Sequence, residues 1–357
     1  WPTISAFIIL SYYSMILSWA LKYLTLSFTK GWGNDTNSYF YKDFLQSSSS
    51  AFEFGYIIWP ILIGIAILWA VNWFICYKGV KGGIEKLNKV LLPLLIVIML
   101  IIVIRGVTLE GAFIGLNKLF TPDWSKMAEP KVWIAAYGQV FFSLSVGMGI
   151  MMTFSSYLPE KSDINNSAFM TAFANCGFEF LCAIGVFGIL GFMAVSQGVP
   201  FEEVVSGGIG LAFIVFPKVF SVMGVWGTIL GVLFFTCLVF AGLTSSVSLV
   251  EAVSSAFIDK TGWERKKVVS LICGLGFVVS IAFATRAGLY LLDIIDNFVN
   301  NYGIVVIGLL EAFVIGWIIK PETIRNHTNE VSYYKIGKWW DITIKYITPA
   351  ILAIMLI

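Results

Sequence analysis

Long apolar segments recur along this chain roughly every 25 to 40 residues, and most reach the ~20 residues that a helix needs to cross a bilayer. In lipid, every backbone N–H and C=O group must be paired within the protein, so only helices and closed β-barrels can span. These segments are about twice as long as barrel strands, which excludes a barrel. The 357 residues are 58% apolar and only 12% charged, which fits a surface that lies mostly in lipid. The sequence therefore predicts an all-α polytopic membrane protein.

Nine such segments can be counted, at residues 2–25, 56–76, 88–109, 133–156, 167–195, 222–257, 267–285, 289–319 and 342–357. Lys and Arg concentrate in the connections around 78–89, 260–267 and 320–345, which the positive-inside rule places in the cytoplasm. The net charge is only +2, so nothing indicates nucleic-acid binding. Because the first and last segments both look cut, we expect a fragment of a longer protein.

Two features are expected toward the outer side of the bundle. The connection 196–221 holds two short apolar stretches separated by SGGIG, and we expect it to fold as an external helical hairpin that acts as a lid. Asp293 and Asp296 are three residues apart at the edge of the eighth segment and so share a helix face. A gate and a solvated helix end both fit this pair. Glu311 lies deeper in the same segment and needs a partner that the sequence does not name.

The fourth segment, VWIAAYGQVFFSLSVGMGIMM, carries glycines and hydroxyls at bilayer depth. Gly147 and Gly149 let the chain leave helical geometry at little cost, and the two half-helices of a broken span end in partial charges that bind ions. A backbone opened at this depth must line a wet cavity or be buried in protein. The alternative is an intact helix with a packing face of small residues, although glycines two positions apart do not share a face.

The fifth segment contains AFANCGFEF, in which Asn175 and Glu179 are four residues apart and share a helix face. An ionisable group within a spanning helix costs at least ~2.5 kcal/mol and marks a functional site by default. Gln139 in the fourth segment is a candidate partner for Glu179. A protonated, neutral Glu179 bonded to a nearby carbonyl is the alternative.

The sixth segment contains FAGLTSSVSLV, which places the Ala241 carbonyl and the hydroxyls of Thr244, Ser245 and Ser246 within about one to two helical turns. Hard monovalent cations prefer oxygen ligands of this kind. Ser and Thr in membrane helices also commonly bond back to a carbonyl of the preceding turn, so a purely local role is the alternative.

Taken together, several of these strings resemble the Na⁺-coupled amino-acid transporters of the neurotransmitter:sodium symporter family, which share the fold of the bacterial leucine transporter. The resemblance rests on KGGIEKLNKVLLPLL, LNKLFTPDW, VWIAAYGQVFFSLSVGMG, AFANCGFEF, VFAGLTSSVSLVEA and IKYITPA, in this order. It implies an inverted-repeat helical fold and a single transporter domain over residues 1–357 that matches the third to eleventh spans. It also implies that the first two spans and the C-terminal end lie outside this chain.

The resemblance assigns roles to individual residues. Tyr13 resembles the tyrosine that bonds the substrate carboxylate, and Phe142 resembles an aromatic cap over the substrate. The implied pocket residues are Ile9, Tyr13, Phe142, Ser145, Met148, Ser245, Ser246 and Leu249. The implied Na⁺ ligands are Ser143 and Asn175 at one site, and Ala241, Thr244 and Ser245 at a second, each site incomplete without the first span. Asp296 resembles the acidic half of an outer gate.

Two positions bear on the choice of ion and substrate. Chloride-dependent members of the family carry a serine where this chain has Glu179, so we expect that Glu179, with Gln139 nearby, replaces chloride. Between the two glycines of the fourth segment, the leucine transporter has a phenylalanine and this chain has Met148, which is thinner and more adaptable. We therefore expect the pocket to admit bulky apolar amino acids, aromatic ones included.

The expected function is import of a hydrophobic amino acid, driven by Na⁺ through alternating access. We expect a multi-pass protein of a bacterial cytoplasmic membrane, monomeric or homodimeric, whose partners are the amino acid, Na⁺ and the bilayer. The inventory of residues argues against an enzyme, because the single His327 lies in a predicted cytoplasmic connection and no catalytic motif accompanies it. A non-transporting amino-acid sensor or a channel on the same fold is the alternative.

Overall fold

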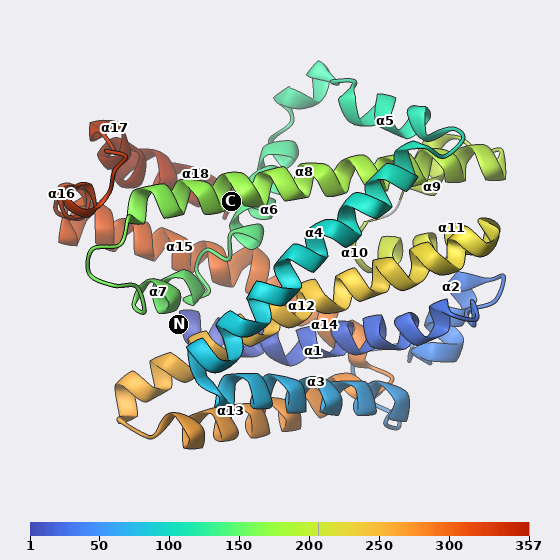
Figure 1. The fold of residues 1–357 in the computed structure, drawn as a ribbon, viewed down its shortest axis with the longest axis horizontal. Coiled ribbons are helices and arrows are strands. Elements are labelled where there is room, and N and C mark those ends of the chain that lie inside the picture. Colours follow the sequence, from blue (N-terminus) through green and yellow to red (C-terminus); the bar gives the residue numbers. More distant parts are fainter. Residues whose placement is uncertain (206, 357) are drawn as a thin grey trace.

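The computed structural model describes residues 1–205 and 207–356, and every regular element within these ranges is a helix (Figure 1). The α-helices are α1 (Pro2–Ser27), α2 (Thr36–Ser38), α3 (Trp59–Tyr77), α4 (Glu85–Val107), α5 (Ala112–Phe120), α6 (Pro130–Ser143), α7 (Ile150–Ser155), α8 (Ile164–Gln197), α9 (Phe201–Val204), α10 (Gly208–Gly210), α11 (Phe216–Val222), α12 (Gly224–Thr261), α13 (Arg265–Ser280), α14 (Gly288–Phe298), α15 (Ile304–Phe313), α16 (Pro321–Val331), α17 (Lys338–Ile342) and α18 (Thr348–Met355). The prediction of an all-α fold is confirmed.

Seven helical stretches among the described residues are long and apolar enough to cross a membrane. They are Pro2–Ser27, Trp59–Tyr77, Val80–Val107, Ile164–Gln197, Gly224–Thr261, Arg265–Ala284 and Gly288–Ile319. Each corresponds to one of the nine predicted segments, with shifted ends. The fourth predicted segment is divided between α6 and α7, and the ninth begins at the last residue of α17 and contains α18.

The helices α1 and α12 pack against each other at the centre of the bundle, with α3 and α13 side by side next to α1 (Figure 1). Buried hydroxyls on α1 find partners on these neighbours. The Ser18 hydroxyl donates to the Ile61 carbonyl at 2.9 Å, and the Ser14 hydroxyl donates to Ser280 at 3.1 Å. Because a buried hydroxyl without a partner is costly, these bonds fix the depth of α1 relative to α3 and α13.

An aromatic cluster at one end of α1 anchors the connection between α8 and α12. Phe213 lies 5.1 Å from Tyr23 and 5.7 Å from Trp19 between ring centroids, and it also stacks on Phe40. Such ring pairs contribute about 0.5 to 1.5 kcal/mol each beyond their buried area. The described residues of the connection are helical in α9, α10 and α11, while the external hairpin and its action as a lid stay predictions.

The helix α8 contacts α4 and α5 through glycines. A methyl group added at Gly188 would lie 2.9 Å from the Gly106 carbonyl oxygen, and one at Gly115 would lie 1.8 Å from the Phe187 carbonyl oxygen. Gly191 is similarly close to the backbone of α5 and of the residue before it. In a bilayer, where no hydrophobic force drives helices together, such close backbone approach is a main source of packing energy.

Replacing Gly115 by alanine should destabilise the protein, because the new methyl group meets a backbone carbonyl that cannot turn away. We expect a loss of about 1 to 3 kcal/mol, the usual cost of overpacking, seen as a lower melting temperature in detergent. Gly138→Ala in α6 is the matched control, because nothing lies within 4 Å of its added methyl group. An equal melting temperature for both variants would contradict the close α5–α8 contact.

Candidate functional site

The helix of the fourth segment is broken between α6 and α7, as predicted. The six residues from 144 to 149 are non-helical, and Ser145, Gly147 and Gly149 all have positive φ, at 55°, 75° and 74°. Gly147 also contacts α15, since an added methyl group would lie 3.1 Å from Ile304 Cγ2. Ser145 has no such freedom, and a non-glycine residue in this conformation is a strained position of the type found at ligand sites.

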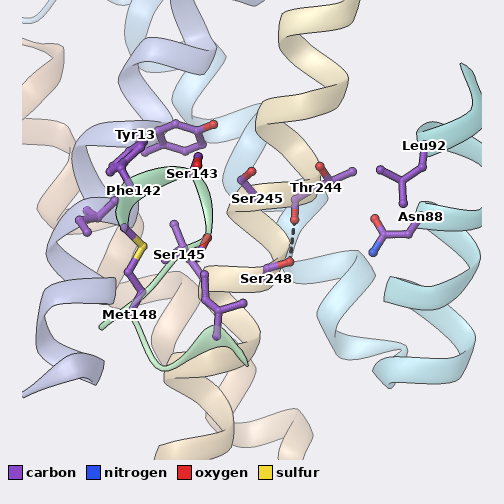
Figure 2. A pocket seen from close by; sticks show the side chains of 13 residues that line it. Tyr13, Asn88, Leu92, Phe142, Ser143, Ser145, Met148, Thr244, Ser245 and Ser248 are labelled. Carbon is purple, nitrogen blue, oxygen red and sulfur yellow. Dashed lines mark hydrogen bonds between the residues drawn. The ribbon is translucent and has the colours of Figure 1, made fainter. Parts of the chain in front are cut away.

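A cavity of about 360 Å³ lies beside this break (Figure 2). Its walls come from α1, α4, α12 and the chain between α6 and α7. The lining residues are Ile9, Tyr13, Asn88, Leu92, Phe142, Ser143, Ser145, Met148, Ile150, Thr244, Ser245, Ser248 and Leu249. Apolar side chains therefore surround a group of hydroxyls, an arrangement that suits a small amphipathic molecule.

The structure brings together all the predicted pocket residues except Ser246. The Ser246 hydroxyl is fully buried and accepts a hydrogen bond from Asn72 Nδ2 on α3 at 2.6 Å, outside the cavity lining. The physical reason is the helical rotation of about 100° per residue, which turns Ser246 away from the face that carries Ser245.

The hydroxyls on α12 fit both roles considered from the sequence, local bonding to a backbone carbonyl and coordination of a cation. Thr244 Oγ1 donates to the Ala241 carbonyl at 2.8 Å, and Ser248 donates to the Thr244 carbonyl at 2.9 Å, which is the local bonding named as the alternative. A hydroxyl that donates its proton keeps lone pairs for a cation, and Thr244, Ser245 and Ser248 present theirs to the cavity. No cluster of three His, Cys, Asp or Glu side chains that could hold a metal occurs in the described part of the chain. Neutral oxygens of this kind suit an alkali cation.

Asn175 connects Ser143, a predicted Na⁺ ligand, to Glu179, the predicted substitute for chloride. Its Nδ2 lies 3.1 Å from Ser143 Oγ and 3.2 Å from Glu179 Oε1, so α6 and α8 meet at this point. The expected partner of Glu179, Gln139, is exposed on α6, and no hydrogen bond joins the two among the described residues. The hydrogen-bond partner of Glu179 is Asn175 instead.

The outer acidic pair is divided between two surroundings. Asp296 Oδ1 accepts hydrogen bonds from the Tyr12 hydroxyl and from Asn300 Nδ2, both at 2.7 Å, whereas Asp293 is exposed. Asp296 therefore contacts α1 at Tyr12, the residue that precedes Tyr13 of the cavity lining. Within the described ranges Glu311 Oε1 is buried and has no hydrogen-bond partner.

Four lining residues were not anticipated from the sequence: Asn88, Leu92, Ile150 and Ser248. Asn88 stands at the boundary where the third predicted segment begins, and no neighbouring polar residue of that segment marks it as part of a site. Ser248 follows the three hydroxyls of the sixth segment by one turn, and this spacing was the available signal.

A buried ion pair on α12, two residues beyond Leu249 of the cavity lining, was also missed. Glu251 is fully buried, and its carboxylate receives two bonds from Arg265, at 2.5 and 2.7 Å, and one from the Tyr157 hydroxyl at 2.6 Å. Arg265 also donates to the Cys76 carbonyl at 2.9 Å. The Glu251 carboxylate thus joins α12 to α13 and to the chain that follows α7, and Arg265 extends this network to the end of α3.

The chain matches the model of the sodium:neurotransmitter symporter family over residues 32–357. It belongs to this family. It is 41% identical to a sodium-dependent transporter of Methanocaldococcus jannaschii, over 98% of this chain and 71% of that protein. It is 28% identical to the sodium- and chloride-dependent taurine transporter of Canis lupus familiaris, over 92% of this chain and 54% of that protein. The crystal structure of MhsT in complex with L-phenylalanine superimposes with a TM-score of 0.81 and 29% identity, covering 99% of this chain and 79% of that one.

These similarities confirm the leucine-transporter-type fold and a multi-pass membrane protein. Members of the family are sodium-dependent transporters rather than enzymes, which also confirms that part of the prediction. The chain spans only part of its relatives, 54% of the canine protein, so the substrate, the ions and the stoichiometry are matters for proposal.

Removing the Glu251 carboxylate should strongly destabilise the protein, because Arg265 would then be left without a charged partner in a buried site. For Glu251→Ala we expect a loss of about 3 to 5 kcal/mol, measured by thermal unfolding in detergent. Lys267→Ala is the control, since its pair with Glu264 is exposed and 4.0 Å long, and such pairs contribute little. A Glu251→Ala protein as stable as this control would refute the importance of the buried pair.

Proposed function

We propose that this protein imports a hydrophobic amino acid, aromatic ones included, together with Na⁺ and without chloride. The observation that carries this proposal is the cavity at the helix break, where apolar walls, hydroxyls and an opened backbone meet. The amino and carboxylate groups of a zwitterion need polar partners in a buried site, while its side chain needs an apolar wall. The cavity offers both within about 360 Å³.

The position of each group supports this assignment (Figure 2). Tyr13 on α1 and the chain around Ser145 flank the polar side, where a carboxylate would bind. Phe142, Met148 and Leu249 provide apolar surface for the side chain, and Phe142 is still 44% exposed, so it is free to close over a ligand. The relative MhsT was crystallised with L-phenylalanine, which agrees with a pocket for bulky apolar amino acids.

The oxygen groups on two sides of the cavity support Na⁺ as the driving ion. Ser143 with Asn175 would contribute to one site, and Ala241, Thr244 and Ser245 to the other. Binding of Na⁺ and substrate to one conformation shifts the equilibrium between outward and inward states by their difference in affinity. The change between outward and inward states would act at the break in the fourth segment, since both half-helices end there.

Glu179 supports independence from chloride. Its carboxylate accepts a hydrogen bond from Asn175, itself a proposed Na⁺ ligand, and Asn175 also donates to the second proposed ligand, Ser143. A carboxylate this close to the proposed ligands can balance the charge of Na⁺ as a bound chloride would. The canine relative, which is named for both sodium and chloride, is only 28% identical to this chain, whereas the archaeal relative, 41% identical, is named for sodium alone.

The test is uptake of radiolabelled phenylalanine, tryptophan and leucine by the full-length protein in proteoliposomes, with Na⁺ or chloride replaced in turn. We expect uptake that requires Na⁺ and is unchanged when gluconate replaces chloride. Glu179→Ser should lower uptake without chloride at least about tenfold, since losing ~1.4 kcal/mol of charge balance has this effect, and added chloride should restore it. The Glu203→Ser variant, on the short helix α9 and outside the cavity, serves as the control.

Two results would contradict the proposal. Amino-acid binding without uptake would favour the sensor, and uptake by the native protein that stops without chloride would refute the role of Glu179. Loss of uptake in Glu203→Ser to the same extent as in Glu179→Ser would show that the effect is not specific to the cavity.

Met148→Phe should narrow the cavity, because a rigid ring would replace a flexible side chain that is buried in its wall. We expect the affinity for tryptophan to fall at least about tenfold relative to that for leucine, measured by competition binding, since overpacking costs about 1 to 3 kcal/mol. Met152→Phe on α7 is the control, because Met152 is 57% exposed and does not line the cavity. An unchanged ratio in Met148→Phe would place the substrate side chain elsewhere.

A further inference from the structure

A second cavity, of about 630 Å³, adjoins the first along α4. The two share Asn88 and Leu92 in their linings. The second cavity is otherwise lined by Val80, Ile84, Glu85, Lys89, Pro93, Phe154, Tyr157 and Leu158. These residues belong to the first turns of the third span and to the chain that ends α7, which the distribution of Lys and Arg places toward the cytoplasm. Asn88 therefore stands between the proposed binding cavity and a larger space on the cytoplasmic side.

Asn88 carries an oxygen without a partner. Its Oδ1 is buried and forms no hydrogen bond among the described residues. An amide oxygen withdrawn from water and left unpaired costs about 1 to 3 kcal/mol, so a native structure that keeps one requires an explanation. Binding of a cation or a water molecule to this oxygen would explain why no protein group pairs with it among the described residues.

Oxygens from α12 face the same space. Figure 2 shows Asn88 on α4 across the cavity from Ser248 and Thr244 on α12. The Ser248 hydroxyl donates its proton to the Thr244 carbonyl, so only its oxygen lone pairs remain available as acceptors toward the cavity. Asn88 and Ser248 thus bring an amide oxygen and a hydroxyl oxygen to the lining of one cavity from two helices. Such oxygens are the ligands that an alkali cation requires, and a hydrogen-bond donor would also satisfy them.

The rim of the second cavity adds one acidic residue. Glu85 is exposed there and forms an i,i+4 pair with Lys89 at 2.6 Å. Because this pair is nearly neutral as a whole, it does not hold a cation strongly, and no charged ligand faces Asn88 from α12 in the first cavity. A site built from neutral oxygens alone binds a cation weakly. Weak binding is what a transient site on an ion pathway requires, because the ion must be able to leave it.

We propose that Asn88 and Ser248 form an additional Na⁺ position on the cytoplasmic side of the cavity, which an ion leaving Thr244 and Ser245 occupies before it reaches the second cavity. This inference rests on the proposed function. Ser248 lies one helical turn beyond Thr244 on α12, so the ion would move by about one turn, roughly 5 to 6 Å, between the two sets of oxygens. The same position would accept Na⁺ that enters from the cytoplasm.

The experiment measures how internal Na⁺ inhibits amino-acid uptake by the full-length protein in proteoliposomes loaded with graded Na⁺ concentrations. For Asn88→Leu, which has a similar volume but no oxygen, we expect the half-inhibiting internal Na⁺ concentration to rise about tenfold, while half-saturation by external Na⁺ stays within about twofold. Ser248→Ala should act in the same direction, and Asn88→Asp should lower the internal concentration. Asn117→Leu, an exposed position on α5, is the matched control.

Three outcomes would overturn the proposal. Unchanged internal inhibition in Asn88→Leu would mean that the oxygen holds a water molecule only, and equal shifts for internal and external Na⁺ would make Asn88 part of the main site. Should Asn88→Leu not fold, as judged by its elution from a sizing column, an unchanged internal inhibition in both Ser248→Ala and Asn88→Asp would overturn it. A native protein without Na⁺-dependent uptake would instead refute the proposed function, and this result is distinguishable because it appears before any substitution is made.

Discussion

An opened backbone cannot be left unpaired in lipid, and the arrangement around the cavity depends on this constraint. The chain from 144 to 149 leaves helical geometry in a span, which is possible because α1, α12 and α15 surround it. Gly147 has a positive φ and packs closely against Ile304, and Ser145 is held at a positive φ that residues with a side chain disfavour. The polar cavity is thus the environment that makes the break tolerable, and the break in turn gives the cavity its backbone groups.

Much of this could be predicted from the sequence because the bilayer imposes length and polarity on each span. The apolar segments, the break at the two glycines and most of the cavity lining follow from positions within single helices. Ser246 shows the limit, since three adjacent hydroxyls cannot all face one cavity when each residue turns the helix by about 100°. Which of the three turns away depends on Asn72, which is 174 residues distant and belongs to a different helix.

The residues that the sequence did not reveal act between segments rather than within one. Asn88 matters because of what α12 places opposite it, and Glu251 because Arg265 and Tyr157 both donate to its carboxylate, while Arg265 also donates to the Cys76 carbonyl at the end of α3. A glutamate near the end of an apolar segment has the same local signature whether it is solvated or paired. Burial distinguishes the two cases, and burial is a property of the assembled bundle.

The glycine contacts of α8 have a mechanical consequence. Where a side chain mediates a contact, a change of rotamer lets two helices slide while they stay packed, but several contacts of α8 with α4 and α5, at Gly188, Gly191 and Gly115, are between backbones. At these points no rotamer change can absorb a shift, so a displacement of α8 is passed on to α4 and α5. The helix that carries Asn175 and Glu179 is in this way mechanically coupled to the helix that carries Asn88, although their side chains lie at different parts of the bundle.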